Sequence, residues 1–366
     1  MRFDRRLITH FEWLLPLLAL AVSGIGAMTV YSATYTPGAE GPAPFALRQL
    51  TWLAAGCAAM LAVLAFDYRR LEHSGFLIYA LLLAAVLAVP VLGRVVSGSR
   101  RWLALGPVSI QPSEFMKLGL VIVLAQHFAA TPGVRLGPRE AVLPLVLTAL
   151  PAAAILAQPD LGTVAVIGLV MLTMLVLGGV RLRWLGTLAA IVAVLAPLIW
   201  PHLKPYQQRR VLTFVNPDLD PLGAGYHVIQ SKIAVGSGLV WGKGFLHGTQ
   251  NQLNFLPEQH TDFIFSVFAE EWGFVGALVL LALYLALVLR GLVIASRARD
   301  RFGVLLALGV TAIVFWQAVV NLGMTTGLLP VVGITLPFFS YGGSSLLCLL
   351  AGIGLVMNVS MRRYFF

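Results

Sequence analysis

The sequence predicts an all-α polytopic membrane protein, and composition, hydropathy and a recurrent segment length carry that prediction. Hydrophobic residues make up 59% of the 366 residues, charged residues only 11%, and the mean hydropathy is +0.88. Soluble domains carry about 25% charged residues. A bilayer is spanned by about 20 consecutive, mostly apolar residues, and such segments recur along the chain. We therefore treat residues 1–366 as a single integral membrane domain.

About ten segments meet the length and apolarity that a spanning helix needs. They cover residues 12–32, 46–66, 74–93, 113–130, 141–157, 161–180, 184–200, 263–290, 303–328 and 341–361. The fifth and the seventh are shorter than the rest and lie at the lower limit of a spanning helix. The sequence therefore predicts about ten transmembrane helices.

The longest connection, residues 201–262, joins the seventh and eighth spans and is too short for an independent soluble core. Its stretch "GYHVIQSKIAV" places Tyr226, Ile229 and Ile233 on one face of a helix and Gln230 and Lys232 opposite. This pattern predicts either a helix at the membrane surface or an ordinary packed loop helix.

Basic residues in the connections indicate the orientation, because cytoplasmic loops carry an excess of Lys and Arg. Most of the 25 basic residues fall in "MRFDRR", "DYRRLEH", "TPGVRLGPRE", "GGVRLRW", "RGLVIASRARDRF" and "MRRYFF", which share one side. We expect both termini to be cytoplasmic and the 201–262 connection to be extracellular. Topology and anionic membrane lipids then explain the net charge of +10, so no nucleic-acid partner is expected.

The sequence disfavours a disulfide, a histidine metal site and a nucleotide-binding loop. Cys57 and Cys348 lie inside apolar spans, and the histidines show no metal-ligand spacing. The stretch "GSGLVWGKG" resembles a P-loop, but Ser237 replaces its first glycine and Gly244 replaces its Ser or Thr. We expect no nucleotide and no organic cofactor.

Four charged residues stand at costly positions near the ends of spans. Glu114 and Lys117 lie three residues apart at the start of the fourth span, Asp160 opens the sixth, and Asp262 opens the eighth. A charge inside a bilayer usually faces a partner or a watery cavity. These three spans enter from the same, outer side, so the four charges are expected to converge in one outward-facing pocket.

The connection "GRVVSGSRRWLALGPVSIQPSE" adds positive charge to the same, outer side. Arg94, Arg100 and Arg101 lie in a short outer loop, where basic clusters are normally avoided. Forked guanidinium groups suit the binding of a diphosphate. The loop therefore predicts an anion site beside the carboxylates.

Each of these charges also has a structural interpretation. Glu114 and Lys117 could form an ion pair that only neutralises itself. Asp160 and Asp262 could be helix N-caps, although Thr261 is an equally good cap beside Asp262.

Two further features have alternatives of the same kind. Glu270 and Glu271 lie deeper in the eighth span, where glutamates more often bridge neighbouring helices than catalyse. The stretch "TGLLPVVGITLPFFSYGGSS", residues 326–345, predicts either a broken, re-entrant segment beside the pocket or a tight outer loop.

Five stretches together carry a resemblance to a known family. They are "GSRRWLALGPVSIQPSEFMKLGL", "QPDLGT", "NPDLDPLGAGYHVIQSKIAVGSG", "FLPEQHTDFIFSVFAEEWG" and "GLLPVVGITLPFFSYGGSS". In order and spacing, over nearly the whole chain, they resemble the SEDS family (shape, elongation, division and sporulation; RodA, FtsW and SpoVE). "HVIQSKIAVGSG" and "GTQNQLNFLPEQHTDFIF" resemble its RodA branch more than its FtsW branch. Gln259 and Trp272 depart from the family pattern without touching the charged set.

The resemblance implies an inverting, lipid-diphosphate-dependent peptidoglycan glycosyltransferase. Such an enzyme polymerises lipid II into glycan strands outside the cytoplasmic membrane during elongation and rod-shape maintenance, and it releases polyprenyl diphosphate. It also implies a class B penicillin-binding protein as partner, with contacts through the eighth and ninth helices. Membrane lipids surround it.

The charged residues suit that chemistry, which needs one base for the acceptor hydroxyl and cations for the leaving group. We assign Asp262 as general base or acceptor-orienting carboxylate, and Lys117, Arg100 and Arg101 to the diphosphate. Glu114 and Asp160 would orient these groups. Together with Asp262 they are also the candidate ligands of a divalent cation, Mg²⁺ or Mn²⁺.

A transporter that flips the lipid-linked precursor is the rival interpretation, because many helices, broken segments and intramembrane charges also fit a carrier. No clear inverted repeat is present, and the charges gather on one side rather than at the midplane. A scaffold for wall enzymes would leave the charged pocket unexplained.

The orientation can be tested with tags. An epitope in the 201–262 connection should be accessible on intact cells, whereas one in "RGLVIASRARDRF" should be accessible only after the membrane is permeabilised. Reversed accessibility would contradict an external site.

Overall fold

The computed structural model of the chain describes residues 11–35, 44–96, 99–106, 108–131, 137–202, 205–216, 223–253, 255–256 and 258–363. Within these residues nine helices are long and apolar enough to cross a membrane. They are α2 (Leu14–Ala33), α3 (Pro44–Ala65), α4 (Arg69–Leu92), α5 (Pro112–Ala130), α6 (Pro138–Ala157), α7 (Leu161–Gly178), α12 (Ile264–Ser296), α13 (Arg301–Thr325) and α14 (Gly343–Met361). All nine coincide with predicted spans, so the all-α polytopic membrane class is confirmed.

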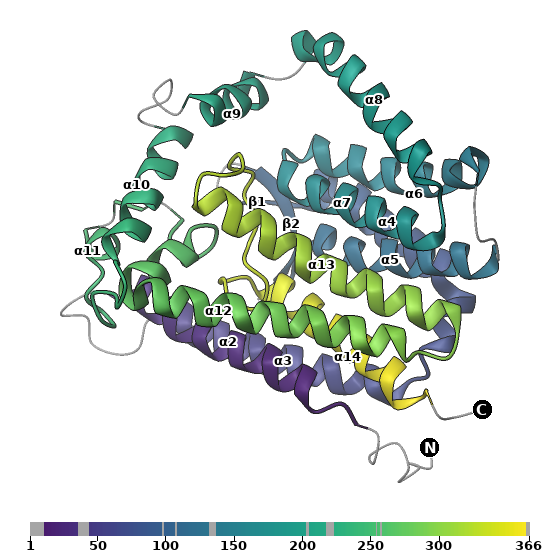
Figure 1. Cartoon of the computed structure of the whole chain (residues 1–366), viewed down its shortest axis with the longest axis horizontal. Coiled ribbons are helices and arrows are strands. Elements are labelled where there is room, and N and C mark those ends of the chain that lie inside the picture. The colour runs from purple at the N-terminus through teal and green to yellow at the C-terminus, as the bar shows by residue number, and fades with distance from the viewer. Residues whose placement is uncertain are drawn as a thin grey trace.

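The remaining predicted span, 184–200, is helical but is not one of those nine. It forms α8 (Leu182–Ile199), which runs away from the bundle in Figure 1. From its end, the 3-10 helix η1 (Trp200–His202) and α9 (Pro205–Val215) lead around the bundle. The total of ten spans stays a prediction.

The described part of the long connection contains two further helices, α10 (Ala224–Ser237) and α11 (Thr249–Gln252). Helix α10 buries Val228, Ser231 and Ala234, and Ser231 Oγ lies 2.6 Å from both Ser266 Oγ and the Thr325 carbonyl oxygen. These contacts make α10 a packed loop helix. The predicted apolar face of Tyr226, Ile229 and Ile233 is not the face that packs on α12 and α13, since Ile233 is 45% exposed, and its contact with the membrane surface stays a prediction. Small side chains form the contact face because they let α10 approach α12 and α13 closely.

The connection between α4 and α5 contains a small sheet that the all-helical prediction missed. Strands β1 (Arg94–Val96), β2 (Ser99–Leu105) and β3 (Val108–Ile110) form an antiparallel meander in the order β1-β2-β3. Arg94 is paired with Trp102, and Leu103 with Ile110. Pairing satisfies backbone groups in a segment too short and too charged for a span.

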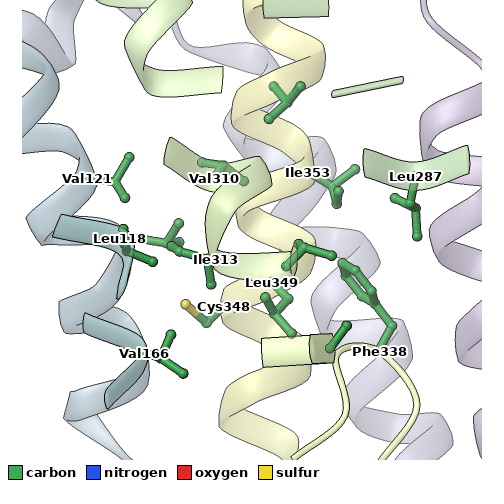
Figure 2. Close-up of a cluster of buried hydrophobic side chains, with 14 of the residues drawn as sticks. Leu118, Val121, Val166, Leu287, Val310, Ile313, Phe338, Cys348, Leu349 and Ile353 are labelled. Atoms are coloured by element: carbon green, nitrogen blue, oxygen red, sulfur yellow. The ribbon is translucent and has the colours of Figure 1, made fainter. Parts of the chain in front are cut away.

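The core lies where α5, α13 and α14 meet. Figure 2 shows Leu118 of α5, Val310 and Ile313 of α13, and Leu349 of α14 turned toward one another. Phe338 reaches this core from outside any helix and packs below Ile353 and Leu287. An irregular segment therefore contributes to the centre of the bundle.

That irregular segment, residues 326–342, connects α13 to α14 and penetrates the bundle. Leu336 and Phe339 are fully buried. Helical side chains satisfy its backbone: Tyr284 Oη donates to the Pro337 carbonyl at 2.6 Å, and Gln49 Nε2 donates to that of Ser340 at 3.1 Å. Non-helical backbone at membrane depth is tolerated where protein buries it. The broken, re-entrant segment is confirmed, and the tight outer loop is wrong.

The bundle has two ends, which differ in the helix termini that they carry. Helix α2 begins and α14 ends at one end of the bundle, while α12 begins at the other, beside α10 and α11 (Figure 1). The predicted cytoplasmic segment 1–10 lies outside the described residues. The charged residues predicted to converge belong to the end that carries the strands.

Two glycines of α2 allow the packing of the irregular segment to be tested. A Cβ on Gly26 would lie 2.4 Å from the Phe339 carbonyl oxygen, whereas a Cβ on Gly24 would meet no atom within 4 Å. Gly26→Ala should lower the melting temperature in detergent, because overpacking costs about 1–3 kcal/mol. Gly24→Ala should leave it unchanged or raise it, because Ala is favoured over Gly in a helix by ~1 kcal/mol. Equal melting shifts, followed by tryptophan fluorescence, would contradict this packing.

Candidate active site

Asp262 stands where α12, α13 and the irregular segment meet. Asn321 of α13 is buried, and its Nδ2 donates to the backbone oxygens of Asp262 at 2.9 Å and Ile334 at 2.6 Å. The Asp262 carboxylate lies over Gly333, where a Cβ would come within 3.3 Å of Oδ2. Gly333 has φ +74°, a conformation that glycine adopts without a steric penalty. Helix α13 and the irregular segment thus hold the backbone at Asp262 and position its carboxylate.

The Asp262 side chain is not a helix cap. Phe263 occupies the N-cap position of α12 and makes no side-chain capping bond. No described residue donates a hydrogen bond to the Asp262 carboxylate, which is only partly exposed. The N-cap interpretation is therefore wrong for Asp262, and its oxygens are available to a ligand.

Neighbouring charges and burial set the protonation of Asp262. Burial, followed by the negative charges of Glu258 and Asp160, raises its pKa to about 7, while Arg101 and Arg210 act in the opposite direction. A carboxyl group with a pKa near the ambient pH can both accept and release a proton. Two carboxylates and two guanidinium groups thus act electrostatically on Asp262.

Arg101 reaches this site from β2. Its Nε donates to the Gln158 carbonyl oxygen at 3.0 Å and its Nη2 to that of Pro159 at 2.6 Å, which attaches the sheet to the turn before α7. Arg100 differs, because successive side chains of a strand point to opposite faces. It is exposed and donates to the Pro90 carbonyl oxygen at 3.2 Å. The pleat thus separates two arginines that the prediction grouped together.

Asp160 is the N-cap of α7. Its Oδ1 accepts from the Thr163 backbone N–H at 3.2 Å, and its Oδ2 accepts from Thr163 Oγ1 at 2.9 Å and Gln111 Nε2 at 3.1 Å. The capping interpretation is confirmed for this residue. Its charge still acts on Asp262, so the cap also belongs to the electrostatic environment of the site.

Glu114 and Lys117 form a buried ion pair within α5. Lys117 Nζ lies 2.9 Å from Glu114 Oε2, and Cys348 Sγ of α14 lies 3.1 Å from the Glu114 carbonyl oxygen. Neither residue is among the charges that act on Asp262. Gln111, at the N-terminus of α5, connects this region to Asp160. The predicted convergence thus brings together Asp262, Asp160 and Arg101, with the ion pair further along α5.

Two members of the site were missed from the sequence. Arg210 lies on α9 in the long connection, and Glu258 lies in the turn before Asp262. Both lie in connections, where a charged residue is ordinary, and the prediction weighted charges at the ends of and inside apolar segments. Asn321 was missed as well, although an amide within an apolar span is a detectable signal.

Two of the three candidate ligands of a divalent cation, Asp160 and Glu114, are already engaged within the protein. Both oxygens of Asp160 already accept hydrogen bonds, and Glu114 is paired with Lys117. Among the described residues, no group of three or more His, Cys, Asp or Glu side chains could hold a metal ion. The predicted Mg²⁺ or Mn²⁺ therefore stays a prediction, and no step below depends on it.

Glu270 and Glu271 bind a loop to the start of α12. Glu270 Oε1 accepts from Lys243 Nζ at 2.6 Å and from the Thr249 backbone N–H at 2.9 Å. Glu271 Oε1 accepts from Ser32 Oγ of α2 and from the Leu246 backbone N–H. The glycine-rich "GSGLVWGKG" is thus a packing loop, and the bridging interpretation of both glutamates is confirmed.

Comparison with known proteins agrees with this architecture. The pattern of the cell cycle protein family that comprises FtsW, RodA and SpoVE matches residues 12–364. The chain belongs to this family. It is 43% identical over 342 residues to the peptidoglycan glycosyltransferase MrdB of Escherichia coli K12, covering 92% of this chain and 91% of that one. It is 33% identical over 429 residues to the peptidoglycan glycosyltransferase RodA of Treponema pallidum, covering 97% and 99%.

Solved structures of family members share the fold. One, described as a peptidoglycan synthase complex that coordinates polymerization and crosslinking, matches with a TM-score of 0.83 at 35% identity, covering 97% of this chain and 99% of that one. The rod shape determining protein RodA of Thermus thermophilus matches with a TM-score of 0.72 at 31% identity, covering 97% and 98%. The resemblance to the FtsW, RodA and SpoVE family is therefore confirmed.

The raised pKa of Asp262 predicts a pH-dependent stability difference. An unfolded Asp ionises near pH 3.9, whereas Asp262 in the fold ionises at about 7. Between these values the unfolded chain releases a proton that the folded chain keeps, so ionisation lowers stability as pH rises and the penalty is complete above 7. Asn has no such penalty. The melting temperature of Asp262→Asn relative to the parent should rise from pH 4.5 to pH 8; a constant difference would contradict the shift.

Proposed function

We infer that this chain is a peptidoglycan glycosyltransferase that polymerises lipid II into glycan strands during cell elongation and rod-shape maintenance. The observation that carries the inference is the Asp262 carboxylate, which accepts no hydrogen bond from the described residues and feels the charges of Arg101, Arg210, Asp160 and Glu258. The activity borne by the names of MrdB and RodA supports the same conclusion.

The chemistry requires one base and nearby positive charge. The acceptor hydroxyl attacks the anomeric carbon of the donor sugar, its proton passes to the Asp262 carboxylate, and the bond to the lipid diphosphate breaks. Diphosphate leaves as an anion, so no second carboxylic acid is needed to protonate it. Attack opposite the leaving group inverts the anomeric carbon. Arg101 would stabilise the negative charge that grows on the diphosphate.

The other predicted residues take supporting roles. Asp160 fixes the start of α7 and, through Gln111, the start of α5. Lys117 is a candidate diphosphate ligand only if substrate displaces its pairing with Glu114. Arg100 lies on the opposite face of β2 and would meet the substrate outside the Asp262 cluster.

The reaction is proposed for the outer face of the cytoplasmic membrane, with both termini inside. Peptidoglycan is built outside the cell, and the basic connections favour this orientation. A class B penicillin-binding protein is the proposed partner, supported by the structural neighbour that couples polymerization to crosslinking. Helix α12 offers a lengthwise exposed apolar stripe for such contacts, formed by Phe274, Leu278, Leu281 and Leu285.

Replacement of Asp262 tests the inference. Asp262→Asn keeps the size of the side chain and removes its basicity, so strand formation from lipid II should fall by ~10²- to 10⁴-fold. The variant should insert normally and melt no lower than the parent. Asp67→Asn, at a partly exposed residue between α3 and α4 that pairs with Arg362 at 3.8 Å, is the control and should retain near-parental activity. A near-parental rate in Asp262→Asn would make Asp160 the leading candidate.

The same assay separates polymerase from flippase. Purified protein in detergent, with lipid II freely accessible and the class B partner added, should form glycan strands. A transporter of the lipid-linked precursor would form none.

A further inference from the structure

Helix α12 is interrupted at Gly273, and a loop from the long connection packs against the interruption. Gly273 has φ +64° and ψ −162°, which lie outside the helical region. The loop comprises residues 238–244 and is called the crossing loop below. Its backbone supplies partners that the broken helix lacks, because the Phe274 N–H donates to the Leu239 carbonyl oxygen at 2.8 Å. The crossing loop therefore contacts α12 backbone to backbone.

This close approach turns the side chains of the crossing loop away from the protein. A Cβ on Gly242 would stand 2.1 Å from the Glu271 carbonyl oxygen, and Gly242 has φ +79°, a conformation that glycine adopts without a steric penalty. Leu239 is 78% exposed and Trp241 is 80% exposed. Two large apolar side chains thus project outward from a loop whose backbone is fixed.

Two polar contacts between α2 and α12 indicate where the membrane boundary lies. Arg290 of α12 pairs with Glu12, just before α2, and Glu271 accepts a hydrogen bond from Ser32 in the last turn of α2. The stretches of the two helices between these contacts each measure roughly 30 Å at about 1.5 Å per residue. The hydrocarbon core of a bilayer has the same thickness, about 30 Å. Glu271 therefore lies at one boundary of that core, and the crossing loop lies there with it.

Aromatic side chains gather at this boundary. Tyr31 of α2 stacks on Phe245 with 6.4 Å between the ring centroids, and its ring lies 6.0 Å from that of Tyr35. Trp272 is exposed beside the interruption of α12. Tyr and Trp are enriched where a membrane meets water, because each combines an apolar ring with a polar group. Trp241 belongs to this set and is its most exposed member.

The apolar surface of the crossing loop continues onto the membrane-spanning part of α12. The Val275 N–H donates to the Val240 carbonyl oxygen at 3.1 Å, and the exposed Val275 and Val279 lie beside the stripe proposed for the class B partner. Lys243 instead turns toward the protein, where its Nζ lies 2.6 Å from Glu270 Oε1. The exposed edge of the loop is thus apolar, as insertion into a lipid leaflet requires.

We propose that the crossing loop is a membrane anchor, which inserts Leu239 and Trp241 into the interfacial region of the lipid leaflet at this end of the bundle. Lipid is the occupant because the loop lies at the boundary of the hydrocarbon core and its apolar edge continues onto a spanning helix. The anchor fixes the depth of the interrupted part of α12, which follows Asp262 in the chain. It goes beyond the proposed polymerase function and requires no substrate.

A spin label on the full chain in lipid nanodiscs tests the anchor. The label is attached at Leu239→Cys after the native cysteines are removed by Cys57→Ala and Cys348→Ala. Its collision rates with oxygen, which concentrates in bilayers, and with a water-soluble nickel chelate are then measured. His247→Cys is the matched control, because His247 is exposed in the same connection outside the crossing loop. The ratio of oxygen to nickel collisions should be severalfold higher at residue 239 than at residue 247.

Tryptophan fluorescence gives a second measurement with the native cysteines in place. The difference between the parent and Trp241→Phe isolates the emission of Trp241, which phospholipids brominated near the headgroup should quench more than aqueous acrylamide does. The reverse order of quenching, or equal nickel access at residues 239 and 247, would overturn the anchor. Nickel access at residue 239 that is lost only when the class B penicillin-binding protein is added would overturn it in favour of a protein interface. None of these outcomes depends on whether the chain polymerises lipid II.

Discussion

The site depends on one buried amide. Asn321 donates to the carbonyl oxygens of both Asp262 and Ile334, and so joins the start of α12 to the irregular segment. In a membrane, backbone groups that leave a helix must find partners within the protein. Asn321 supplies that partner from α13, one of the central helices. The location of the carboxylate is therefore a consequence of how a broken segment is satisfied inside the bundle.

The same constraint explains why the irregular segment can support chemistry. Ser340 Oγ donates to the Thr261 carbonyl oxygen at 2.6 Å, and the Tyr341 N–H donates to that of His260 at 2.9 Å. The turn before α12 is therefore bound at successive residues. Asp262 sits on rigid backbone while its side chain has no fixed partner among the described residues. A carboxylate whose backbone is held in place and whose oxygens are unpaired suits proton transfer.

Much of the site could be anticipated because charge inside an apolar span is unusual. That signal identified Asp262, Asp160 and the Glu114–Lys117 pair. Because the sixth and eighth spans enter the membrane from the same side, Asp160 and Asp262 were expected at one end. Arg100 and Arg101 could not be separated without knowing that the loop forms a strand, whose pleat turns them to opposite faces. Arg210 and Glu258 lie in connections, where a charge is ordinary and carries no signal.

The sequence by itself determined the membrane class, nine of the helices and the family, because hydropathy, span length and motif order are local properties of the chain. Only the tertiary structure decided which charged side chain forms a cap or an ion pair and which stays available to a ligand. Asp160 and Asp262 both open helices, yet one accepts three hydrogen bonds and the other accepts none from the described residues. That difference arises from side chains and backbone far away in sequence, whose distances no local pattern encodes.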